Sequence, residues 1–250
     1  MKALVELPLV TSYAQRNSII ENSIRKNISN NQELQILEAG CGQCWEIDLT
    51  GVNYRLTGID LDRVALSIRI EKYNDLNEII EGDLRDVDLG GRTFDAIYNS
   101  YVLEHVSGAE TVLCNFVKWT KPGGVIIIKI PDPSSVKGFI TRITPHWFHI
   151  FYYKHLLGIK TAGRPGFMPY PTYFDSVVSR QGINKFCEKN GLQVEAEYGE
   201  GLTKPGVGVR RILIQLFIRT VAFVSFGVLS SKHTNLLYIL RRDKAVGRQS

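Results

Sequence analysis

Residues 34–44 read LQILEAGCGQC, an apolar run that ends in two closely spaced glycines. The run has the length and composition of a buried strand, and glycines allow the chain to turn tightly at its end. Gly40 and Gly42 also leave room for a ligand to approach the main chain closely. The stretch predicts a strand, a tight turn and a helix over 43–49 whose N–H groups would favour an anionic group.

Short apolar runs of the same kind recur along the chain and alternate with helical patterns. We expect further strands at 54–60, 77–83, 94–100, 124–131, 192–199 and 236–242. We expect helices at 62–73, 108–120 and 176–190, with KPGG at 121–124 ending the second of these. This alternation predicts an α/β fold, a Rossmann-like doubly wound sheet that is mostly parallel with an antiparallel last strand.

Two inserts interrupt the regular pattern in the second half of the chain. Residues 133–175 form an aromatic-rich segment that contains FITRITPHWFHIFYYKHLLG and has the position of a lid. Residues 203–231 form a helical insert between the last two expected strands, and it is strongly apolar over 210–231. We therefore expect a single domain over 1–250, with its core at 34–131 and both additions in the second half.

Charge is distributed unevenly along the chain. Residues 1–132 hold 13 basic and 19 acidic residues, a net charge of −6, whereas residues 133–250 hold 17 and 6, a net charge of +11. The basic half is where an anionic substrate or membrane surface would bind, although a solvated surface gives the same composition. Hydrophobic residues make up 44% of the chain and charged residues 22%, as is usual for a globular protein with a core.

The cysteines and the start of the chain indicate a compartment. Cys41 and Cys44 form a C-x-x-C pair, but no second pair or histidine lies at zinc-like spacing, so we expect no metal and no disulfide scaffold. The first residues lack the apolar run and cleavage site of a secretory signal. We expect a cytoplasmic protein, with peripheral contact to the inner membrane surface as an added option.

Acidic residues end the second and third expected strands. Asp60 lies twenty positions after Gly40, where a carboxylate can bind ribose hydroxyls in both NAD enzymes and methyltransferases. Trp45 stands where a dinucleotide fold has its third glycine, and Asp83 ends the third strand within reach of an adenine amino group. These features disfavour an NAD(P)-dependent oxidoreductase. Taken singly, each residue has a structural alternative: Asp60 as a helix N-cap, Asp83 as a turn residue.

The motifs E-A-G-C-G, G-I-D-L-D, E-G-D-L, F-D-A-I-Y-N-S-Y-V-L-E-H-V and K-P-G-G-V together resemble class I methyltransferases, particularly the small-molecule group called type 11. The resemblance covers about 34–131, and more loosely 176–199 and 236–242. It implies S-adenosylmethionine as cofactor, with the methionine part near Glu38, the ribose near Asp60, the adenine near Asp83 and the sulfonium near Asn99. The implied cofactor-binding residues are Glu38, Gly40, Cys41, Gly42, Asp60, Leu61, Asp83, Leu84, Asn99, Ser100 and Tyr101.

Histidines supply the candidate general bases for such a transfer. They are His105 in the L-E-H-V motif and His146 and His149 in the aromatic insert; each has packing as its alternative role. The sequence Asn99-Ser100-Tyr101-Val102 differs from the Asn-Pro-Pro-Tyr of enzymes that methylate amino groups of adenine or glutamine. We therefore expect a small-molecule or lipid-attached acceptor, methylated on a hydroxyl oxygen, and no nucleic acid. A non-catalytic partner that binds S-adenosylmethionine stays open as an alternative.

The apolar segment 210–231 has three possible roles. It is nearly long enough to span a bilayer, but Gln215 and Arg219 fall four residues apart on one face. An amphipathic helix in a membrane interface, with Arg210 and Arg211 at its start, accounts for both facts. Packing on the protein's own core and a homodimer interface are the alternatives.

Overall fold

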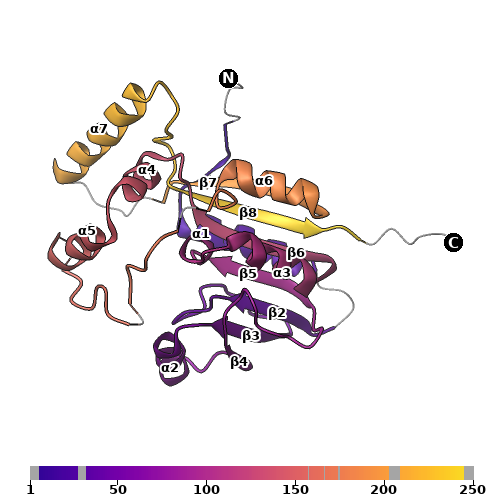
Figure 1. The fold of residues 1–250 in the computed structure, drawn as a ribbon. Helices are drawn as coiled ribbons and strands as arrows, with labels where there is room; N and C mark the ends of the chain where they lie inside the picture. Colours follow the sequence, from indigo (N-terminus) through magenta and orange to yellow (C-terminus); the bar gives the residue numbers. More distant parts are fainter. Residues whose placement is uncertain are drawn as a thin grey trace.

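The fold is built on a single eight-stranded sheet in the order β1-β7-β8-β6-β5-β2-β3-β4 (Figure 1). The computed structural model describes residues 6–27, 32–156, 158–165, 167–173, 175–202 and 209–244. The strands are β1 Leu9–Val10, β2 Leu34–Ala39, β3 Tyr54–Asp60, β4 Glu78–Glu81, β5 Phe94–Ser100, β6 Thr120–Pro131, β7 Leu192–Glu200 and β8 Asn235–Arg242. The predicted doubly wound α/β sheet is confirmed.

β8 alone runs against its neighbours. It pairs antiparallel with both β6 and β7, whereas the other pairs of adjacent strands are parallel. The predicted antiparallel last strand is therefore confirmed. Glu200, the last residue of β7, pairs in register with Asn235, the first residue of β8. The whole connection 201–234 thus leaves the sheet and returns to it at one place.

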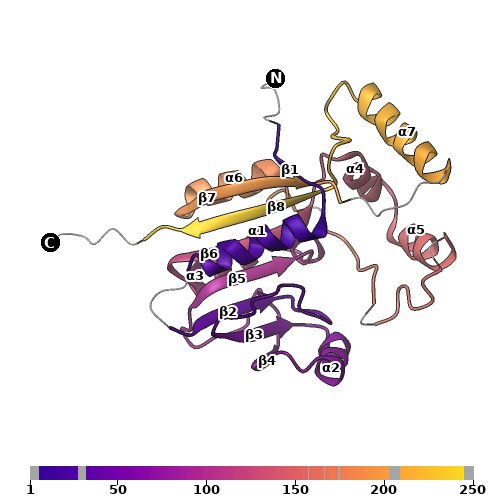
Figure 2. The ribbon, with the colours of Figure 1, turned by 180° about the vertical axis from the view of Figure 1, so that it is seen from behind.

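Helices cover both faces of the sheet (Figures 1 and 2). α1 (Tyr13–Arg25) covers one face, where Ile20 packs in a cluster with Ile127 of β6. α3 (Ala109–Trp119) and α6 (Arg180–Lys189) cover the other, where Phe116 packs in a cluster with Ile128. Because alternate residues of β6 enter opposite clusters, this strand is buried on both sides, as expected of a central strand in an α/β sheet.

Side-chain caps fix where several helices begin. The side chain of Asp62 accepts hydrogen bonds from the N–H groups of Val64 and Ala65 at the start of α2 (Arg63–Lys72). Ser12 and Ser179 cap α1 and α6 in the same way. Each of these residues satisfies an N–H group that the first turn of a helix leaves without an intrahelical partner. α2 confirms the helix predicted at 62–73.

The helix predicted over 43–49 is wrong. This segment contains no helix, and its apolar side chains alternate with polar ones. Trp45 packs edge-to-face on Tyr98 with ring centroids 5.5 Å apart, and Ile47 and Leu49 are buried in the same cluster. Alternation of apolar and polar residues is the pattern of an extended chain that lies on a core. Here this pattern decides the structure, although a Gly-rich turn of this kind is often followed by a helix. The glycine turn therefore has no helix N-terminus behind it.

Several boundaries also differ from the predicted ones. β6 begins at Thr120, directly after α3, so the KPGG segment belongs to the strand, where pairing with β5 shifts between Phe94 and Ala96. The helix expected from 176 starts at Arg180, and α7 (Val209–Val224) ends before the predicted 231. α1 was not predicted, because its apolar residues are few and spaced among polar ones.

The aromatic and apolar inserts lie together beyond the edge at which the parallel strands end (Figures 1 and 2). The aromatic insert forms α4 (Val136–Ile143) and α5 (His146–Phe151), followed by a π-helical turn at Tyr152–Leu156. α7 packs against α4, and Ser135 forms a bridge with Ser230. Within the described part of the chain, no helix has the length and apolarity needed to cross a bilayer.

Gly138 fixes how closely α4 approaches the sheet. A Cβ atom at this position would lie 2.0 Å from the carbonyl oxygen of Asp132, which cannot move without shifting the main chain after β6. We expect Gly138→Ala to lower the free energy of unfolding by about 1–3 kcal/mol, although alanine is normally the better helix former. Urea denaturation measures this change, with the exposed neighbour change Lys137→Ala as control. Equal stability of the two variants would contradict the close approach.

Candidate active site

The glycine turn after β2 lies at the edge where the parallel strands end, next to the loop that follows β5. Gly40 has a φ of +73°, and a Cβ there would lie 2.2 Å from a methyl carbon of Val102. Gly42 has a φ of +54°, and no atom lies within 4 Å of the place its Cβ would take. Gly40 is thus required by packing, whereas Gly42 presents bare main chain to open space.

Asp60 ends β3 beside this turn and holds it in place. Its Oδ2 accepts a hydrogen bond from Gly42 N at 2.7 Å, and its Oδ1 accepts one from Asp62 N at 2.8 Å. Burial raises the pKa of the Asp60 carboxyl, and these N–H donors oppose the shift. The alternative in which Asp60 is a helix N-cap is wrong, because Asp62 caps α2. Asp60 and the glycine turn therefore form one unit.

Arg69, which the sequence analysis did not single out, supports the turn from inside. It lies on α2 and is only 1% exposed. Its Nη1 lies 2.7 Å from Glu38 Oε2 and donates to Cys41 O at 2.7 Å, while its Nε donates to Asp75 Oδ1 at 2.9 Å. Burial raises the pKa of Glu38, and the nearby guanidinium opposes that shift. The Glu38 carboxylate and the Cys41 carbonyl thus both contact the Arg69 guanidinium beneath the turn.

Asn99 and Tyr101 occupy different environments, although they were predicted together. Asn99 is fully buried at the end of β5, where its Nδ2 donates to Ala39 O at 2.7 Å. Its Oδ1 has no hydrogen-bond partner among the described residues. Tyr101 has a φ of +56°, and its hydroxyl donates to Glu200 Oε2 at 3.0 Å and accepts from Asn235 Nδ2 at 2.9 Å. Asn99 therefore joins β5 to β2 at the cofactor side, whereas the Tyr101 hydroxyl is bonded to β7 and β8.

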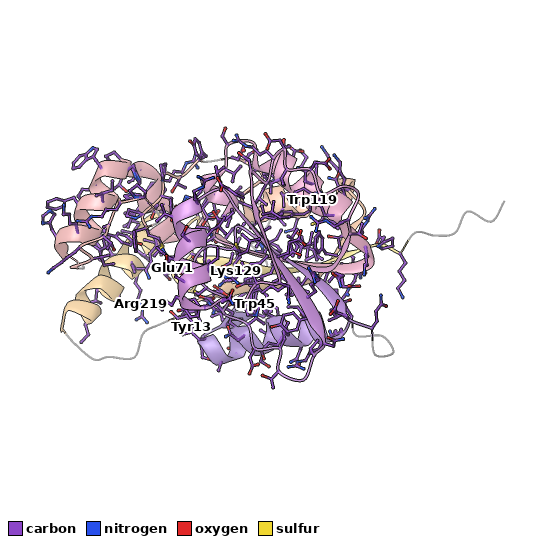
Figure 3. All side chains as sticks on the ribbon, turned by 90° about the horizontal axis from the view of Figure 1, so that it is seen from below. Tyr13, Trp45, Glu71, Trp119, Lys129 and Arg219 are labelled. Atoms are coloured by element: carbon purple, nitrogen blue, oxygen red, sulfur yellow. The ribbon has the colours of Figure 1, made fainter. Side chains whose placement is uncertain are left out.

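A buried lysine adjoins Tyr101 on the side covered by α1. Lys129 of β6 lies 4.8 Å from the centroid of the Tyr101 ring, and its Nζ is 3.4 Å from Glu46 Oε2. Glu46 is also bound by Arg16 of α1 at 3.1 Å. Burial lowers the pKa of Lys129. Lys129 is only 1% exposed, and its label lies near the middle of the view in Figure 3. The cluster thus places a buried cation beside Tyr101.

The predicted adenine side is more open. Leu61, directly after Asp60, is 67% exposed, whereas Leu84 is buried. Asp83 accepts a hydrogen bond from Arg85 Nε at 3.0 Å, and this arginine lowers the pKa of the Asp83 carboxyl. Asp83 therefore stays ionised at the surface and already has a partner. An amino group of a ligand would share the carboxylate with Arg85 or displace it.

These residues fit S-adenosylmethionine. The exposed Leu61 side chain offers an apolar surface for the adenine, and Asp60 offers an acceptor for ribose hydroxyls. The open space at Gly42 admits the methionine part against bare main chain. The unpartnered Asn99 Oδ1 can accept a hydrogen bond from a ligand.

A cavity of about 1270 Å³ adjoins this edge of the sheet. Glu104 and His105 of the loop after β5 form one wall, and α4, α5, α7 and residues 168–185 form the others. Tyr170, in the cavity wall, donates from its hydroxyl to Asp62 Oδ2 at 3.3 Å, which joins the wall to the loop after Asp60. The cavity is thus connected to the predicted cofactor site through one side chain.

His105 is arranged as a neutral base at the cavity wall. Its Nδ1 lies 2.6 Å from the carbonyl oxygen of Pro171, and because a carbonyl only accepts, Nδ1 carries the proton. Nε2 then holds a lone pair. Burial lowers the pKa of His105, which favours this neutral form.

Glu104, another residue that the sequence analysis did not single out as a site residue, lies beside His105. It is buried, with Oε1 3.9 Å from His105 Nε2, and its Oε2 has no hydrogen-bond partner among the described residues. Burial raises the pKa of this carboxyl to about 8. The L-E-H-V motif held the signal, but only the fold shows that its carboxylate faces inward.

The histidines of the aromatic insert differ in how they lie relative to the cavity. His149 lines the cavity, where its Nε2 lies 2.6 Å from Thr144 Oγ1, and burial lowers its pKa. His146 packs edge-to-face on His149, with ring centroids 6.3 Å apart, but is outside the cavity lining. Among the described residues, no group of three or more histidine, cysteine and carboxylate side chains is placed to hold a metal ion.

Comparisons with known proteins agree with this site. Residues 37–128 match the family model described as "Methyltransferase domain". A probable S-adenosylmethionine-dependent methyltransferase of Mycolicibacterium smegmatis is 29% identical over 98 residues, which cover 39% of this chain and 38% of that protein. A demethylmenaquinone methyltransferase of Oceanobacillus iheyensis is 27% identical over 168 residues, covering 60% of this chain and 68% of that one. The chain thus spans well under half the length of the first relative.

Solved structures share the fold more widely. The cyclase SpnF is 11% identical and has a TM-score of 0.51, with 93% of this chain and 84% of that chain covered. At this identity the likeness concerns the fold alone, and function has to be argued from the site.

We predict that Asp60→Ala weakens the binding of S-adenosylmethionine by about 1–3 kcal/mol, because charge-assisted hydrogen bonds to the ribose are lost. Isothermal calorimetry with the cofactor and its demethylated product measures this loss. Glu71→Gln, an exposed change on α2, is the matched control, and the melting temperature reports whether the turn still folds. Unchanged affinity in Asp60→Ala, or binding of NAD by the wild-type protein, would contradict the assignment.

Proposed function

We propose that this chain, which carries a class I S-adenosylmethionine-dependent methyltransferase domain, transfers the methyl group of S-adenosylmethionine to a hydroxyl oxygen of a small or lipid-attached acceptor. The observation that carries the proposal is the neutral His105, whose Nε2 holds a lone pair at the wall of a large cavity. A hydroxyl needs to lose its proton as it is methylated, and a neutral imidazole can accept that proton.

The chain's own residues have three tasks in this reaction. S-adenosylmethionine supplies a methyl carbon that its sulfonium has already activated. Asp60 and the glycine turn orient the cofactor, and the insert helices exclude water from the cavity. His105 Nε2 accepts the hydroxyl proton while Nδ1 stays bonded to Pro171 O, which fixes the ring.

Glu104 supports the protonated state of His105. The carboxyl lies 3.9 Å from His105 Nε2 and is buried. When the imidazole gains a proton, the positive charge favours ionisation of this neighbour, and the two charges then stabilise each other. Glu104 acts through His105 and is a positioning residue in this scheme.

The cavity favours an acceptor with a large apolar part. Its volume of about 1270 Å³ exceeds the usual range of roughly 300–1,000 Å³ for small-molecule pockets. Much of its wall is apolar or aromatic, as expected for a lipid-attached acceptor: Ile140, Phe148, Tyr152, Tyr153, Tyr170 and Ile218.

The proposal includes a peripheral contact of the 210–231 segment with a membrane, in line with a lipid-attached acceptor. α7 forms most of this segment, and Leu216 and Phe223 are exposed on it. The side chains of Arg210, Arg211 and Leu213 lie outside the described residues. A homodimer through α7 and a cytoplasmic location stay predictions.

The test is methyl transfer itself. The purified protein is incubated with methyl-labelled S-adenosylmethionine and, separately, with the aqueous and organic-solvent extracts of cells. We expect label in an organic-soluble product that carries a new methyl ether. Label in neither extract, with the cofactor still bound, would favour the non-catalytic alternative, and a labelled amine or carbon would exclude the hydroxyl.

We predict that His105→Gln lowers kcat by about 10²–10⁴-fold, the usual contribution of a general base, and leaves cofactor affinity within a factor of two or so. Steady-state kinetics and calorimetry measure the two quantities. His155→Gln, which alters an exposed histidine outside the cavity lining, is the matched control and should retain full turnover. Equal losses in both variants would assign these histidines a structural role.

The rate should also depend on pH in one direction. His105 acts in its neutral form, and burial holds its pKa below the ordinary value of about 6.5. We therefore expect protonation of His105 to lower kcat/KM only below about pH 6.5. Glu104, whose pKa is about 8, titrates between pH 6.5 and 8, so any change in that range should be absent in Glu104→Gln. A fall above pH 6.5 that persists in Glu104→Gln would show that another group is the base.

A further inference from the structure

Three helices expose large apolar side chains at one end of the molecule. α4, α5 and α7 lie together beyond the edge where the parallel strands end (Figures 1 and 2). Contiguous exposed apolar patches of this kind mark interaction sites in soluble proteins. Six large exposed side chains define what we call the apolar platform: Ile143, Trp147, Phe151, Leu216, Phe223 and Phe226. Three of these are 67%, 84% and 91% exposed, namely Trp147, Phe223 and Phe226.

The same helices separate the platform from the cavity. On α4, Ile140 lines the cavity while Ile143, one turn later, is exposed. On α7, Ile218 is buried against the cavity while Leu216 is exposed. On α5, Phe148 lines the cavity and its neighbour Trp147 is exposed. The helices that carry the platform therefore also line the cavity.

The segments that build the platform carry charge of one sign. The segment 133–174 contains five lysines and arginines and no acidic residue, and 209–231, which holds α7, contains three and none. In the whole chain the two kinds are nearly balanced, at 30 and 25. Acidic residues are thus absent from the segments that build the platform, and these segments are complementary to an anionic surface.

One face of α7 combines both properties. Ile212, Leu216, Arg219 and Phe223 are exposed, and their spacing places them on the same side of the helix. Figure 3 shows Arg219 at the end of the molecule that carries the insert helices, away from Trp119. An arginine within an apolar face suits a membrane interface, where apolar groups enter the acyl region and the guanidinium binds phosphate. Between two copies of α7 it would be buried beside a second arginine or need a carboxylate.

We infer that the apolar platform is a docking surface for an anionic lipid bilayer, and that the acceptor reaches the cavity from that bilayer. The inference extends the contact from α7 to α4 and α5. It rests on the proposed function, because the cavity that these helices line is taken to hold the acceptor. The helices lie in the interface without crossing the membrane.

Vesicle flotation tests the docking without any turnover. The full chain is mixed with vesicles of phosphatidylcholine, with or without phosphatidylglycerol, at low and high salt. We expect flotation that requires phosphatidylglycerol and weakens with salt. The double variant Trp147→Ser/Phe223→Ser should weaken binding at least about tenfold, because two aromatic side chains no longer enter the lipid. Ile70→Ser/Tyr73→Ser, which alters two exposed apolar residues at α2, is the matched control and should float like the wild type.

Fluorescence identifies the lipid contact directly. Brominated acyl chains quench tryptophan on contact, and Trp147 is exposed on the platform whereas Trp119 is buried. We expect quenching that is lost in Trp147→Phe.

Three results would overturn the inference: no flotation on phosphatidylglycerol, equal loss in the platform and control variants, or a concentration-dependent dimer that the platform variant makes monomeric. The last would assign the platform to a second copy of this chain. Flotation without methyl transfer would contradict the proposed function and leave the docking surface intact. Methyl transfer to a soluble acceptor without flotation would support the proposed methyl transfer and overturn the docking surface.

Discussion

The buried guanidinium of Arg69 is the constraint on which the site depends. It joins α2 to the glycine turn by contacting Glu38, the Cys41 carbonyl and Asp75 at once. Burying a cation is costly unless it is fully paired, and here the contact with the Cys41 carbonyl also fixes the main chain of the turn. Because the turn has no helix behind it, this network and the Asp60 carboxylate hold its conformation.

The strands were predictable because burial on both faces leaves a direct trace in composition. LQILEAG and GVIIIKIP are apolar at nearly every position, and both form strands of the central sheet. The segment 43–49 was predicted wrongly because the expectation of a helix after a Gly-rich turn was preferred to the alternation of Trp45, Ile47 and Leu49. α4 and α5 are rich in aromatic and β-branched residues, which pack in either kind of element, so local pattern left their helical state open.

The site was predictable in part, and a physical reason separates the residues that could be predicted from those that could not. Motifs locate residues on a strand end, as with Asp60 and Asn99, since parallel strands bring their carboxyl ends to one edge. They do not show partners that arrive from distant segments. Tyr101 meets Glu200 and Asn235, and Lys129 meets Glu46, only because β7, β8 and the 43–49 loop fold back onto β5 and β6. Glu104 could be read from the sequence motif, but the motif does not show that its Oε2 lacks a hydrogen-bond partner among the described residues, because that depends on the packing around it.

The pairing of Glu200 with Asn235 has an evolutionary consequence. The connection 201–234 leaves and rejoins the sheet at paired residues of neighbouring strands. A change in its length or sequence therefore need not alter how the strands of the core pair. Such a connection can be lengthened, shortened or exchanged in a descendant protein at little cost in loop entropy, while the cofactor edge stays unchanged. The connection that we propose to meet lipid or acceptor is thus free to diversify, and kinship among proteins with this core says little about what each of them methylates.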